Sequence, residues 1–521
     1  MALDVPAQAH RAATKHDADY VFYELTRSIC PECRRVIDAQ ILLRDGKVVM
    51  RKRCPEHGRF EALVYGDAAA YTAAAKFNKP GTIPLAFSTP VREGCPHDCG
   101  LCPDHQQHVC LGIIEVNSAC NMDCPLCFAD AGAGFNLTLE EVEEILDHLV
   151  ATEGSPEVVQ FSGGEPTIHP QIIPMLAAAK RRNIRHVMLN TNGKRIAADD
   201  AFLAELAEVR PSVYFQFDGF EAETYRVLRG EPGILPTKLR ALDRLAGIGC
   251  GVVLVPAVER GVNDHEVGAI VKFGLEHPAV RGINFQPAHH AGRHGAHDPM
   301  ARVTIPDVLG WMEAQTEGLF LKSDFVPVPC CFPTCNSVTY AYVDGDTVVP
   351  LTRLLNVDDY LDYIANRVVP DLSGEIKQAL EGLWSSSAVP GSEKAAAEFA
   401  LSCAACDTFG ARSGLTGLDL GAFADKMFMV MLQDFMDPWT FNQKNLMKCC
   451  KEFLLPGGKQ VPFCAYNTLG YREQARAQLQ ARERARNRAR RAGAPHEPAP
   501  ITFDVVRPYP HRPLAPNGRA R

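Results

Sequence analysis

The chain has 521 residues and a formal net charge of −8, with 46% hydrophobic and 22% charged residues. This is an ordinary globular balance, and the net acidity argues against nucleic acid as a partner. The N-terminus lacks a secretory signal, and no stretch approaches the roughly 18 consecutive apolar residues of a membrane helix, so a cytoplasmic protein is expected, with peripheral contact at the membrane left open.

The first predicted element, residues 1–66, is a metal-binding β unit. Residues 39–54 form two apolar-rich strands around a turn at 44–47, and metal-ligand side chains flank this hairpin. The 19 cysteines of the chain fall in tight groups, which favours metal binding over disulfides in a reducing compartment. We expect a zinc-ribbon or rubredoxin-like site with one mononuclear zinc or iron. Its candidate ligands are Cys30, Cys33, Cys54 and His57.

Residues 67–110 are expected to be a connector, partly helical, that ends in a cysteine-rich loop. Four cysteines follow the spacing C-x3-C-x2-C-x7-C. Four thiolates in so short a span can close a complete auxiliary [4Fe–4S] cluster or hold a single zinc or iron. His105 and His108 are alternative ligands or surface residues of the loop. The cysteines are Cys95, Cys99, Cys102 and Cys110.

Residues 111–300 alternate short apolar strands with helical stretches, a pattern typical of parallel β/α units. Thr138 and Glu141 are expected to cap the helix between the first two strands. We therefore predict an α/β fold containing a partial (β/α)6 barrel, with its chemistry at the C-terminal ends of the strands. The predicted strands are Leu111–Val116, Glu157–Phe161, His186–Leu189, Val213–Phe217, Gly251–Val255 and Gly282–Phe285.

The central motif, C-x3-C-x2-C, comprises Cys120, Cys124 and Cys127 just after the first of these strands. Three thiolates at this spacing can each hold one iron of a [4Fe–4S] cube and leave the fourth iron open for a substrate. The alternative is a structural zinc site. Zinc sites usually close with four ligands, and no further His or Cys follows locally, so the cluster is favoured and these three cysteines are predicted to be catalytic.

Polar residues end the later barrel strands and are candidates for cofactor binding. Glycines permit close approach of a ligand to the backbone, and a carboxylate suits an ammonium group. Each residue could instead be a helix cap or a turn residue. The candidates are Gly163, Gly164, Glu165, Asn192, Gln216, Asp218, Asn284 and Gln286, with Asn190 as a further strand-end residue.

Residues 301–470 are expected to form a C-terminal auxiliary cluster domain, and 471–521 an Arg-rich helix with a disordered tail. The apolar segment 422–439 is either a buried core helix or the lining of an apolar channel. The helix at 472–491 could dock on anionic head groups or simply be solvated. The cysteines suffice for one or two further clusters, and which of them ligate is open. They are Cys330, Cys335, Cys403, Cys406, Cys449, Cys450 and Cys464.

The C-x3-C-x2-C motif, followed at the second strand by Gly-Gly-Glu, resembles the radical S-adenosylmethionine (SAM) superfamily. In that superfamily the open iron binds the amino and carboxylate groups of SAM, and one electron cleaves SAM to methionine and a 5′-deoxyadenosyl radical. The resemblance implies that the Gly163–Glu165 motif contacts the SAM amino group. One departure is Leu126, where the superfamily often has an aromatic residue.

Longer stretches resemble the tetraether lipid synthase family, among them RCPEHG, GCPHDCGLCPDHQQHVCL and FMDPWTFNQKNLMKCCKEFLLPGGKQVPFCAYN. That resemblance implies tail-to-tail C–C coupling of membrane lipids, with a lipid substrate at the membrane surface and a reductant such as ferredoxin or flavodoxin. Related sequences have been interpreted as methyltransferases of a pterin-like precursor, which is the alternative. A non-catalytic electron carrier is the second class of hypothesis, and an open iron followed by Gly-Gly-Glu argues against it.

Overall fold

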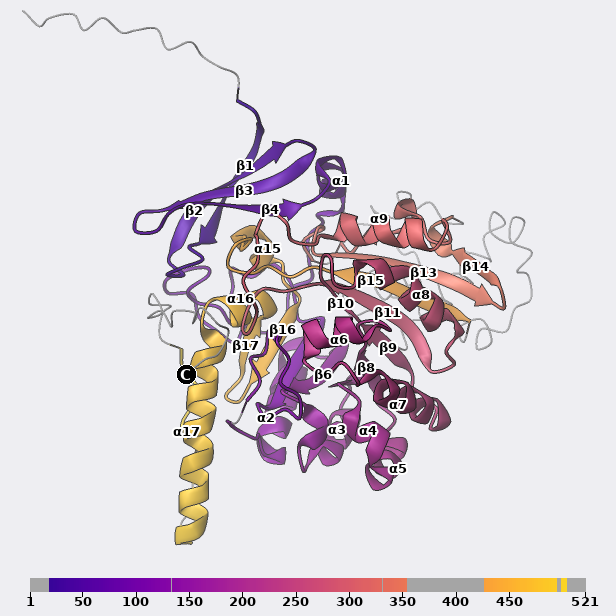
Figure 1. Cartoon of the computed structure of the whole chain (residues 1–521). Coiled ribbons are helices and arrows are strands. Elements are labelled where there is room, and N and C mark those ends of the chain that lie inside the picture. Colours follow the sequence, from indigo (N-terminus) through magenta and orange to yellow (C-terminus); the bar gives the residue numbers. More distant parts are fainter. Residues whose placement is uncertain (1–17, 133, 330, 354–425, 494–497, 504–521) are drawn as a thin grey trace, which may run out of the picture.

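The structure is a computed structural model that describes residues 18–132, 134–329, 331–353, 426–493 and 498–503. The N-terminal strands β1–β4 lie over one end of a large mixed sheet, whose helices α2–α5 and α7 cover its outer face, and the long helix α17 projects away from the body (Figure 1). Cys330, Cys403 and Cys406 fall outside the described residues.

The N-terminal unit is a four-stranded antiparallel sheet in sequential order. The expected hairpin is present, and its turn places Asp45 and Gly46 at φ 51° and 72°. Two consecutive positive φ values match the twist of a tight hairpin, and Gly reaches this region without steric cost. The strands are β1 (Val21–Ile29), β2 (Val36–Arg44), β3 (Lys47–Cys54) and β4 (Gly58–Tyr65).

The barrel contains the six parallel strands that the sequence predicts, each paired with its neighbour in chain order. The central strands are apolar on both faces because both are covered, as expected for a parallel sheet. Their ends lie within two residues of the predicted limits. The strands are β5 (Leu111–Asn117), β6 (Val158–Gly163), β7 (His186–Thr191), β8 (Ser212–Gln216), β9 (Val252–Val255) and β11 (Val280–Pro287).

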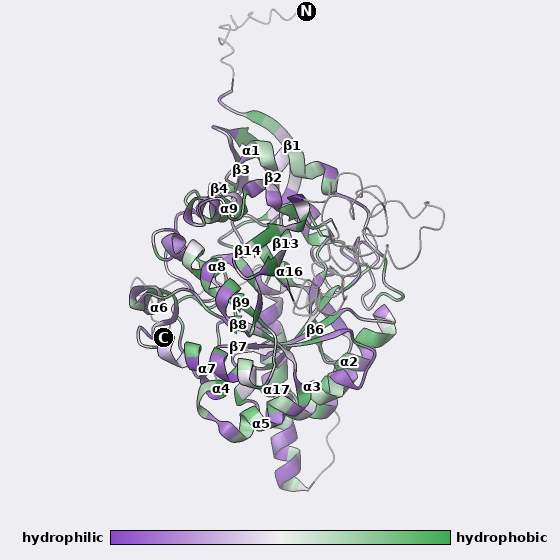
Figure 2. Cartoon of the chain, turned by 90° about the vertical axis from the view of Figure 1, so that its right-hand side faces the viewer, coloured by the Kyte–Doolittle hydropathy of each residue, from purple (hydrophilic) through white to green (hydrophobic). Residues whose placement is uncertain are grey.

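Amphipathic helices pack on the outside of this sheet, with apolar strands at the centre of the molecule and polar faces outward (Figure 2). α2 (Leu139–Glu153) buries Val142, Ile145, Leu146 and Leu149, one helical stripe. The expected capping box is present: Thr138 Oγ1 accepts from Glu141 N at 3.2 Å and Glu141 Oε2 accepts from Thr138 N at 2.9 Å. The other helices of this layer are α3 (Ile172–Lys180), α4 (Lys194–Ala198), α5 (Asp200–Val209), α6 (Ala222–Arg229), α7 (Leu235–Gly247) and α8 (Val267–Glu276).

The C-terminal segment extends the barrel sheet at both of its edges, where a separate domain was expected. β15 (Met427–Gln433) pairs in parallel with β11 and antiparallel with β13 (Asn336–Asp344), while β16 (Lys451–Leu455) pairs in parallel with β5. A partial barrel leaves two edges with unpaired backbone groups, and these strands satisfy them. Within the described residues the result is one 13-stranded sheet. The remaining strands are β10 (Ala257–Val258), β12 (Val326–Pro327), β14 (Thr347–Pro350) and β17 (Lys459–Pro462).

The expectation of a helix within 422–439 is wrong for the residues that are described. Met427–Gln433 forms strand β15, and all of its residues are buried. The segment is apolar all round because β15 lies between two strands inside the sheet, where both faces are covered. The candidate channel-lining residues of the segment are its large apolar ones: Phe423, which lies outside the described residues, and Met427, Phe428, Met431, Phe435 and Met436.

The Arg-rich helix is present as α17 (Tyr471–Ala492). Tyr471, Ala475 and Leu479 bury its first half against the body, and the second half projects outward (Figure 1). Among the helices that the structure describes, none has the length and apolar character needed to cross a membrane. The remaining helices are α1 (Ala68–Ala73), α9 (Ile305–Gln315), α15 (Gln443–Met447) and α16 (Phe463–Thr468), with short 3-10 turns η1 (Ala74–Phe77) and η2 (Pro166–Ile168).

Candidate active site

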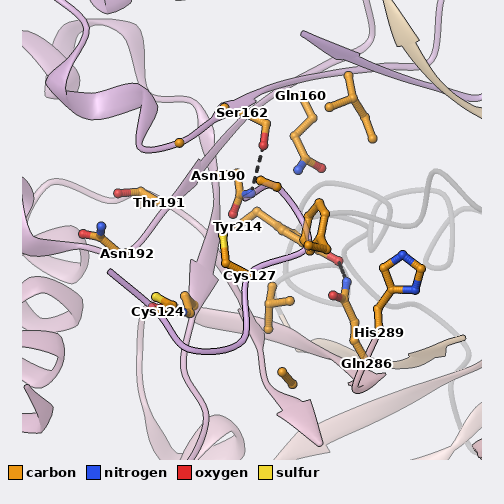
Figure 3. Close-up of a pocket in the computed structure, with 18 of the residues that line it drawn as sticks. Cys124, Cys127, Gln160, Ser162, Asn190, Thr191, Asn192, Tyr214, Gln286 and His289 are labelled. Carbon is orange, nitrogen blue, oxygen red and sulfur yellow. Dashed lines mark hydrogen bonds between the residues drawn. The ribbon is translucent and has the colours of Figure 1, made fainter. Parts of the chain in front are cut away.

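A cavity opens at the C-terminal ends of the barrel strands, and the three cysteines of the central motif line it. In Figure 3, Cys124 and Cys127 lie on the loop after β5, facing Asn190, Thr191 and Tyr214 on the neighbouring strands. Every parallel strand of the barrel contributes residues to the lining of this cavity, because the carboxyl ends of parallel strands meet at one edge. The other predicted residues that line the cavity are Gly163, Gly164, Glu165, Asn190, Asn192, Gln216 and Gln286.

The cysteine loop is held at both ends by backbone hydrogen bonds. Gly164 N and Glu165 N donate to the carbonyls of Asn117 and Ala119 at 3.0 and 2.8 Å, and Cys127 exchanges two hydrogen bonds with Arg293, at 2.8 and 2.9 Å. A Cβ added at Gly163 or Gly164 would lie 2.3 Å from Asn117 O or 2.1 Å from Ala119 O. The Gly-Gly pair is therefore required for close packing of the loop against β6.

The thiols of the motif fit an iron–sulfur cluster with one open iron. Among the residues that the structure describes, Cys120, Cys124 and Cys127 are the only cysteines lining this cavity. Burial raises the pKa of Cys120 to about 12 and also raises that of Cys124, which Arg229 partly offsets. Iron binds the thiolate, so loading the site must release these protons. When bound, such a cluster would supply an electron to a ligand held on its open iron.

Glu165 is buried and connects β6 to β7. Its Oε1 accepts hydrogen bonds from Thr167 N (3.0 Å), Thr167 Oγ1 (2.6 Å) and Thr191 Oγ1 (2.8 Å), and its Oε2 accepts one from Asn192 N (2.8 Å). Burial raises its pKa. Each carboxylate oxygen has two lone pairs, so Oε2, which accepts one hydrogen bond, keeps one position for a further donor.

Asn190 at the end of β7 and Asn192 just after it make hydrogen bonds within the protein. Asn192 Nδ2 donates to Asn121 Oδ1 at 2.7 Å, and its Oδ1 accepts from Lys194 N at 3.0 Å, so Asn192 orients the cysteine loop and caps the turn. Asn190 Nδ2 donates to Ser162 Oγ at 3.2 Å, as Figure 3 shows. Both side chains still face the cavity.

Gln216 and Asp218, at the end of β8, have different surroundings. Lys238 Nζ donates to Gln216 O (2.7 Å) and Gln216 Oε1 (3.0 Å), and burial lowers the pKa of Lys238 to about 8. Asp218 is fully buried, does not line the cavity, and pairs bidentately with Arg229 at 2.6 and 2.7 Å. Arg229, which the sequence analysis missed, lines the cavity in its place.

Asn284 and Gln286 of β11 converge on one tyrosine. Gln286 Nε2 donates to Tyr214 OH at 3.0 Å (Figure 3), and Asn284 Nδ2 donates to Tyr214 OH and to Gln433 Oε1 (3.0 Å). Asn284 lies behind the tyrosine and does not line the cavity. Burial raises the pKa of Tyr214, so its hydroxyl stays neutral.

Several cavity residues were not predicted because they lie inside strands or far away in sequence. Gln160 and Ser162 alternate along β6 and share its inward face, as Tyr214 and Gln216 do on β8, a period-2 signal that was available. Four phenylalanines form one wall, and Phe435 stacks on Phe463 with centroids 4.2 Å apart. The unpredicted lining residues include Gln160, Ser162, Tyr214, Arg229, His289, Gln433, Lys451, Phe128, Phe435, Phe453 and Phe463.

The ribbon forms a closed mononuclear site. Cys33 and Cys54 Sγ are 3.9 Å apart, and His57 Nδ1 lies 3.7 Å from Cys30 Sγ and 3.5 Å from Cys54 Sγ. A tetrahedral zinc with bonds of about 2.3 Å to sulfur and about 2.0 Å to nitrogen implies separations of about 3.8 and 3.6 Å. The Cys3His set therefore fits a single zinc or iron ion without rearrangement.

The loop cysteines divide into two groups. Cys95, Cys99 and Cys102 line a small cavity together with residues of α15 and the end of β17. Cys110 is absent from that lining: its Sγ lies 3.4 Å from His108 Nε2, and its N donates to Cys450 O because β5 begins at the next residue. His105 Nε2 lies 2.6 Å from Cys449 O. Ligation by Cys110 stays a prediction.

The described C-terminal cysteines also gather. Burial raises the pKa of Cys335, and Cys464 and Cys450 add to this effect; burial also raises the pKa of Cys464, with Cys449 adding to it. These four cysteines come from the start of β13, the loop before β16 and the start of α16. The structure therefore brings together cysteines that the sequence left as separate pairs.

Two family models match the chain. The model described as the HMPTM N-terminal zinc ribbon domain matches residues 22–66, and the model of the radical SAM superfamily matches residues 114–274. The matched ranges coincide with the four-stranded N-terminal sheet and with the barrel strands β6–β9 and most of β5. The chain is thus a radical SAM protein that uses SAM and a [4Fe–4S] cluster and carries a mononuclear metal in its ribbon.

A similar protein of known activity is the 7,8-dihydro-6-hydroxymethylpterin dimethyltransferase of Methanocaldococcus jannaschii, 34% identical over 86% of this chain and 94% of the relative. The GTP 3′,8-cyclase of Geobacter sulfurreducens is 28% identical over 34% of this chain and 55% of its own. Among solved structures, Streptococcus suis SuiB bound to its precursor peptide covers 41% of this chain at 15% identity, with a TM-score of 0.35, too low to support an argument.

The expectation of lipid tail coupling is wrong. The relative that aligns over nearly the full length of both chains is a pterin methyltransferase. The motifs that resembled the lipid synthases contain the predicted metal ligands, so they indicate a metal-binding architecture and say little about the substrate. Of the five described residues among the channel-lining candidates, Phe435 alone lines the cavity.

Proposed function

Because this chain belongs to the radical SAM family of the 7,8-dihydro-6-hydroxymethylpterin dimethyltransferase, we propose that it methylates a reduced pterin or a closely related heterocycle. The alignment over 86% of this chain at 34% identity carries the proposal. The ribbon match extends the likeness beyond the barrel that all radical SAM proteins share.

The chemistry of the cavity supports a heterocyclic substrate. A pterin presents a flat ring edged with nitrogen and oxygen atoms, which needs both hydrogen-bonding groups and an aromatic surface. Tyr214 OH and the Gln286 amide supply donors and acceptors on one side. Phe435 and Phe463 supply the aromatic surface on another. A hydrocarbon tail would leave the amides unsatisfied at a cost of about 1–3 kcal/mol each.

The chain's own residues would then divide the work. We place SAM over the central motif, with its ammonium on the free position of Glu165 Oε2 and its polar edge toward Gln216 and Asn192. The reduced heterocycle would occupy the space toward Tyr214, Gln286 and the phenylalanines. Burial of this end of the barrel would exclude water from a reactive carbon. An external one-electron reductant such as ferredoxin or flavodoxin is part of the proposal.

The decisive experiment incubates anaerobically reconstituted protein with SAM, a reductant and 7,8-dihydro-6-hydroxymethylpterin. We expect a pterin product heavier by one or two methylene units, together with 5′-deoxyadenosine, both measured by liquid chromatography with mass spectrometry. Deoxyadenosine formed at the same rate with and without the pterin, and no methylated product, would refute the substrate class.

A variant pair tests the side chains. Tyr214→Phe removes the hydroxyl that Gln286 contacts and should lower methylated product about tenfold, the worth of one hydrogen bond of about 1.4 kcal/mol. Because the hydrogen bonds of the Tyr214 hydroxyl go to Asn284 and Gln286, SAM cleavage without substrate should persist. Tyr342→Phe, on β13 with its hydroxyl near the surface residue Asp344, is the matched control and should leave both reactions unchanged.

A further inference from the structure

The loop after β11 contains four histidines, at 289, 290, 294 and 297. His289 lines the active-site cavity. The next residue, His290, faces another way: its Nε2 lies 3.4 Å from Glu259 Oε2 and its Nδ1 lies 4.0 Å from Asp437 Oδ2. A second polar cluster therefore lies beside the cavity.

This cluster has the composition of a metal site. One ligand atom from each of His290, His297 and Asp437 lies within 4.8 Å of the others. His290 is 6% exposed and Asp437 is 1% exposed, so solvent does not satisfy them. Such convergence of buried imidazole and carboxylate groups needs a reason, because each would otherwise be more stable in water.

Two of the ring nitrogens have no hydrogen-bond partner. They are His290 Nδ1 and His297 Nε2, and the two rings stack in parallel with centroids 3.8 Å apart. A neutral imidazole offers a lone pair at such a nitrogen. An unsatisfied buried nitrogen costs about 1–3 kcal/mol.

Asp437 directs one oxygen toward the histidines. Its Oδ1 accepts from Trp439 N (2.9 Å), Thr440 N (3.0 Å) and Thr440 Oγ1 (3.1 Å). These bonds fix the carboxylate within its turn and leave Oδ2 on the side of His290.

We propose that His290, His297 and Asp437 bind a divalent cation of the zinc class, with Glu259 at the opposite ring nitrogen, His290 Nε2, as the outer carboxylate that orients the imidazole. Two imidazole nitrogens and a carboxylate oxygen suit a borderline transition-metal ion, whereas Mg²⁺ and Ca²⁺ prefer all-oxygen sites. Bonds of about 2.0–2.2 Å imply donor separations of about 3.4 Å. Binding therefore draws the donors together and turns one ring out of the stack, because parallel rings cannot both direct a lone pair at one ion.

The ion would fix three parts of the molecule at one point. Arg293, in the same loop, pairs with Cys127 of the central motif. Lys52 of the ribbon donates to Pro438 O at 2.8 Å, beside Asp437. An ion held by His290, His297 and Asp437 connects the loop that supports the central motif to the turn on which the ribbon rests. Its role is structural, and it is distinct from the thiolate-rich ribbon site.

Cobalt titration of the full chain tests the proposal. Protein with reconstituted clusters is treated with a chelator and titrated anaerobically with Co²⁺. Cobalt in the ribbon gives strong thiolate-to-metal absorption, whereas cobalt bound by nitrogen and oxygen gives only weak visible bands. We expect a second equivalent of the latter type. His297→Gln and Asp437→Asn should each weaken it at least about a hundredfold, since even second-shell changes cost 10–100-fold.

The variants are chosen to keep the fold. Asp437→Asn retains Oδ1 as an acceptor for the turn, and His297 is only half-buried. His148→Gln is the matched control: it also has a buried ring nitrogen without a partner, but it lies far along the chain on α2. Absence of the second equivalent in the unaltered chain, equal uptake by His297→Gln, or equal loss in His148→Gln would overturn the proposal. Unchanged cluster absorbance in each variant verifies folding.

Discussion

The ribbon and the mouth of the barrel both hold metal through cysteines, yet they are built in opposite ways. In the ribbon, four donors from the two ends of one hairpin unit already lie 3.5–3.9 Å from their neighbours. In the barrel, three cysteines share a cavity with side chains from six strands. A closed donor set leaves a metal no position for chemistry, whereas an open set with space beside it can bind and activate a ligand.

The largest expected effect tests the open site. Cys127→Ala should abolish formation of 5′-deoxyadenosine, because a cluster with two protein ligands cannot be held, while the ribbon keeps its metal. The product is measured by mass spectrometry and ribbon metal by elemental analysis. Cys250→Ala, which removes a buried cysteine that lies apart from the others, is the control and should remain active. Activity surviving in Cys127→Ala would show that the two sites do not differ as described.

The next effect tests the closed site. Cys54→Ser should lose one mononuclear metal and melt the ribbon, since structural zinc contributes about 10 kcal/mol or more to small domains. Rates of SAM cleavage by the remaining folded barrel should change by less than about tenfold. Limited proteolysis within 22–66 and metal analysis provide the measurements. Complete loss of SAM cleavage with the core cluster intact would mean that the ribbon takes part in the chemistry.

A smaller effect is expected on the pH dependence of stability, for one buried lysine in the ribbon and one in the barrel. Burial lowers the pKa of Lys52 to about 7 and that of Lys238 to about 8, against 10.5 in the unfolded chain. Between these values the unfolded chain binds more protons, so stability rises with pH by up to about 1.4 kcal/mol per pH unit for each lysine. Lys52→Met should remove the rise in stability that begins near pH 7. Lys238→Met should remove the rise that begins near pH 8.

Thermal midpoints measured from pH 7 to 10 distinguish the pH range in which Lys52 affects stability from the range in which Lys238 does. Replacing the exposed Lys47 by Met on the same hairpin is the control and should leave the slope unchanged. Identical slopes in all three variants and in the parent chain would refute the assignment of these lysines.

The smallest effect is expected from a substitution that lowers stability and leaves both metal sites intact. Thr138→Ala removes the capping box of α2 and should cost about 1 kcal/mol, a shift of a few degrees or less in a chain of this size. Thr138→Ser keeps the hydroxyl and should recover most of the loss. Metal content and deoxyadenosine formation should not change in either variant, and a change in either one would mean that α2 supports a metal site.

The sequence by itself determined the elements whose signals are local. The ribbon ligands follow from spacing around a hairpin, the cap at Thr138 from a four-residue motif, and the six parallel strands from alternation of apolar runs with helices. The central cysteines follow from C-x3-C-x2-C. These features depend on neighbours in the chain, which a sequence displays directly.

Only the tertiary structure decided which distant residues meet. It showed that β15 is a strand inside the sheet, that Arg229 lines the cavity in place of Asp218, and that Phe435 and Phe463 face residues more than a hundred positions away. It also placed Asp437 beside His290 and His297, which the sequence analysis did not connect. Local patterns fix secondary structure and ligand spacing, but partners across a sheet are chosen by the packing of the whole chain.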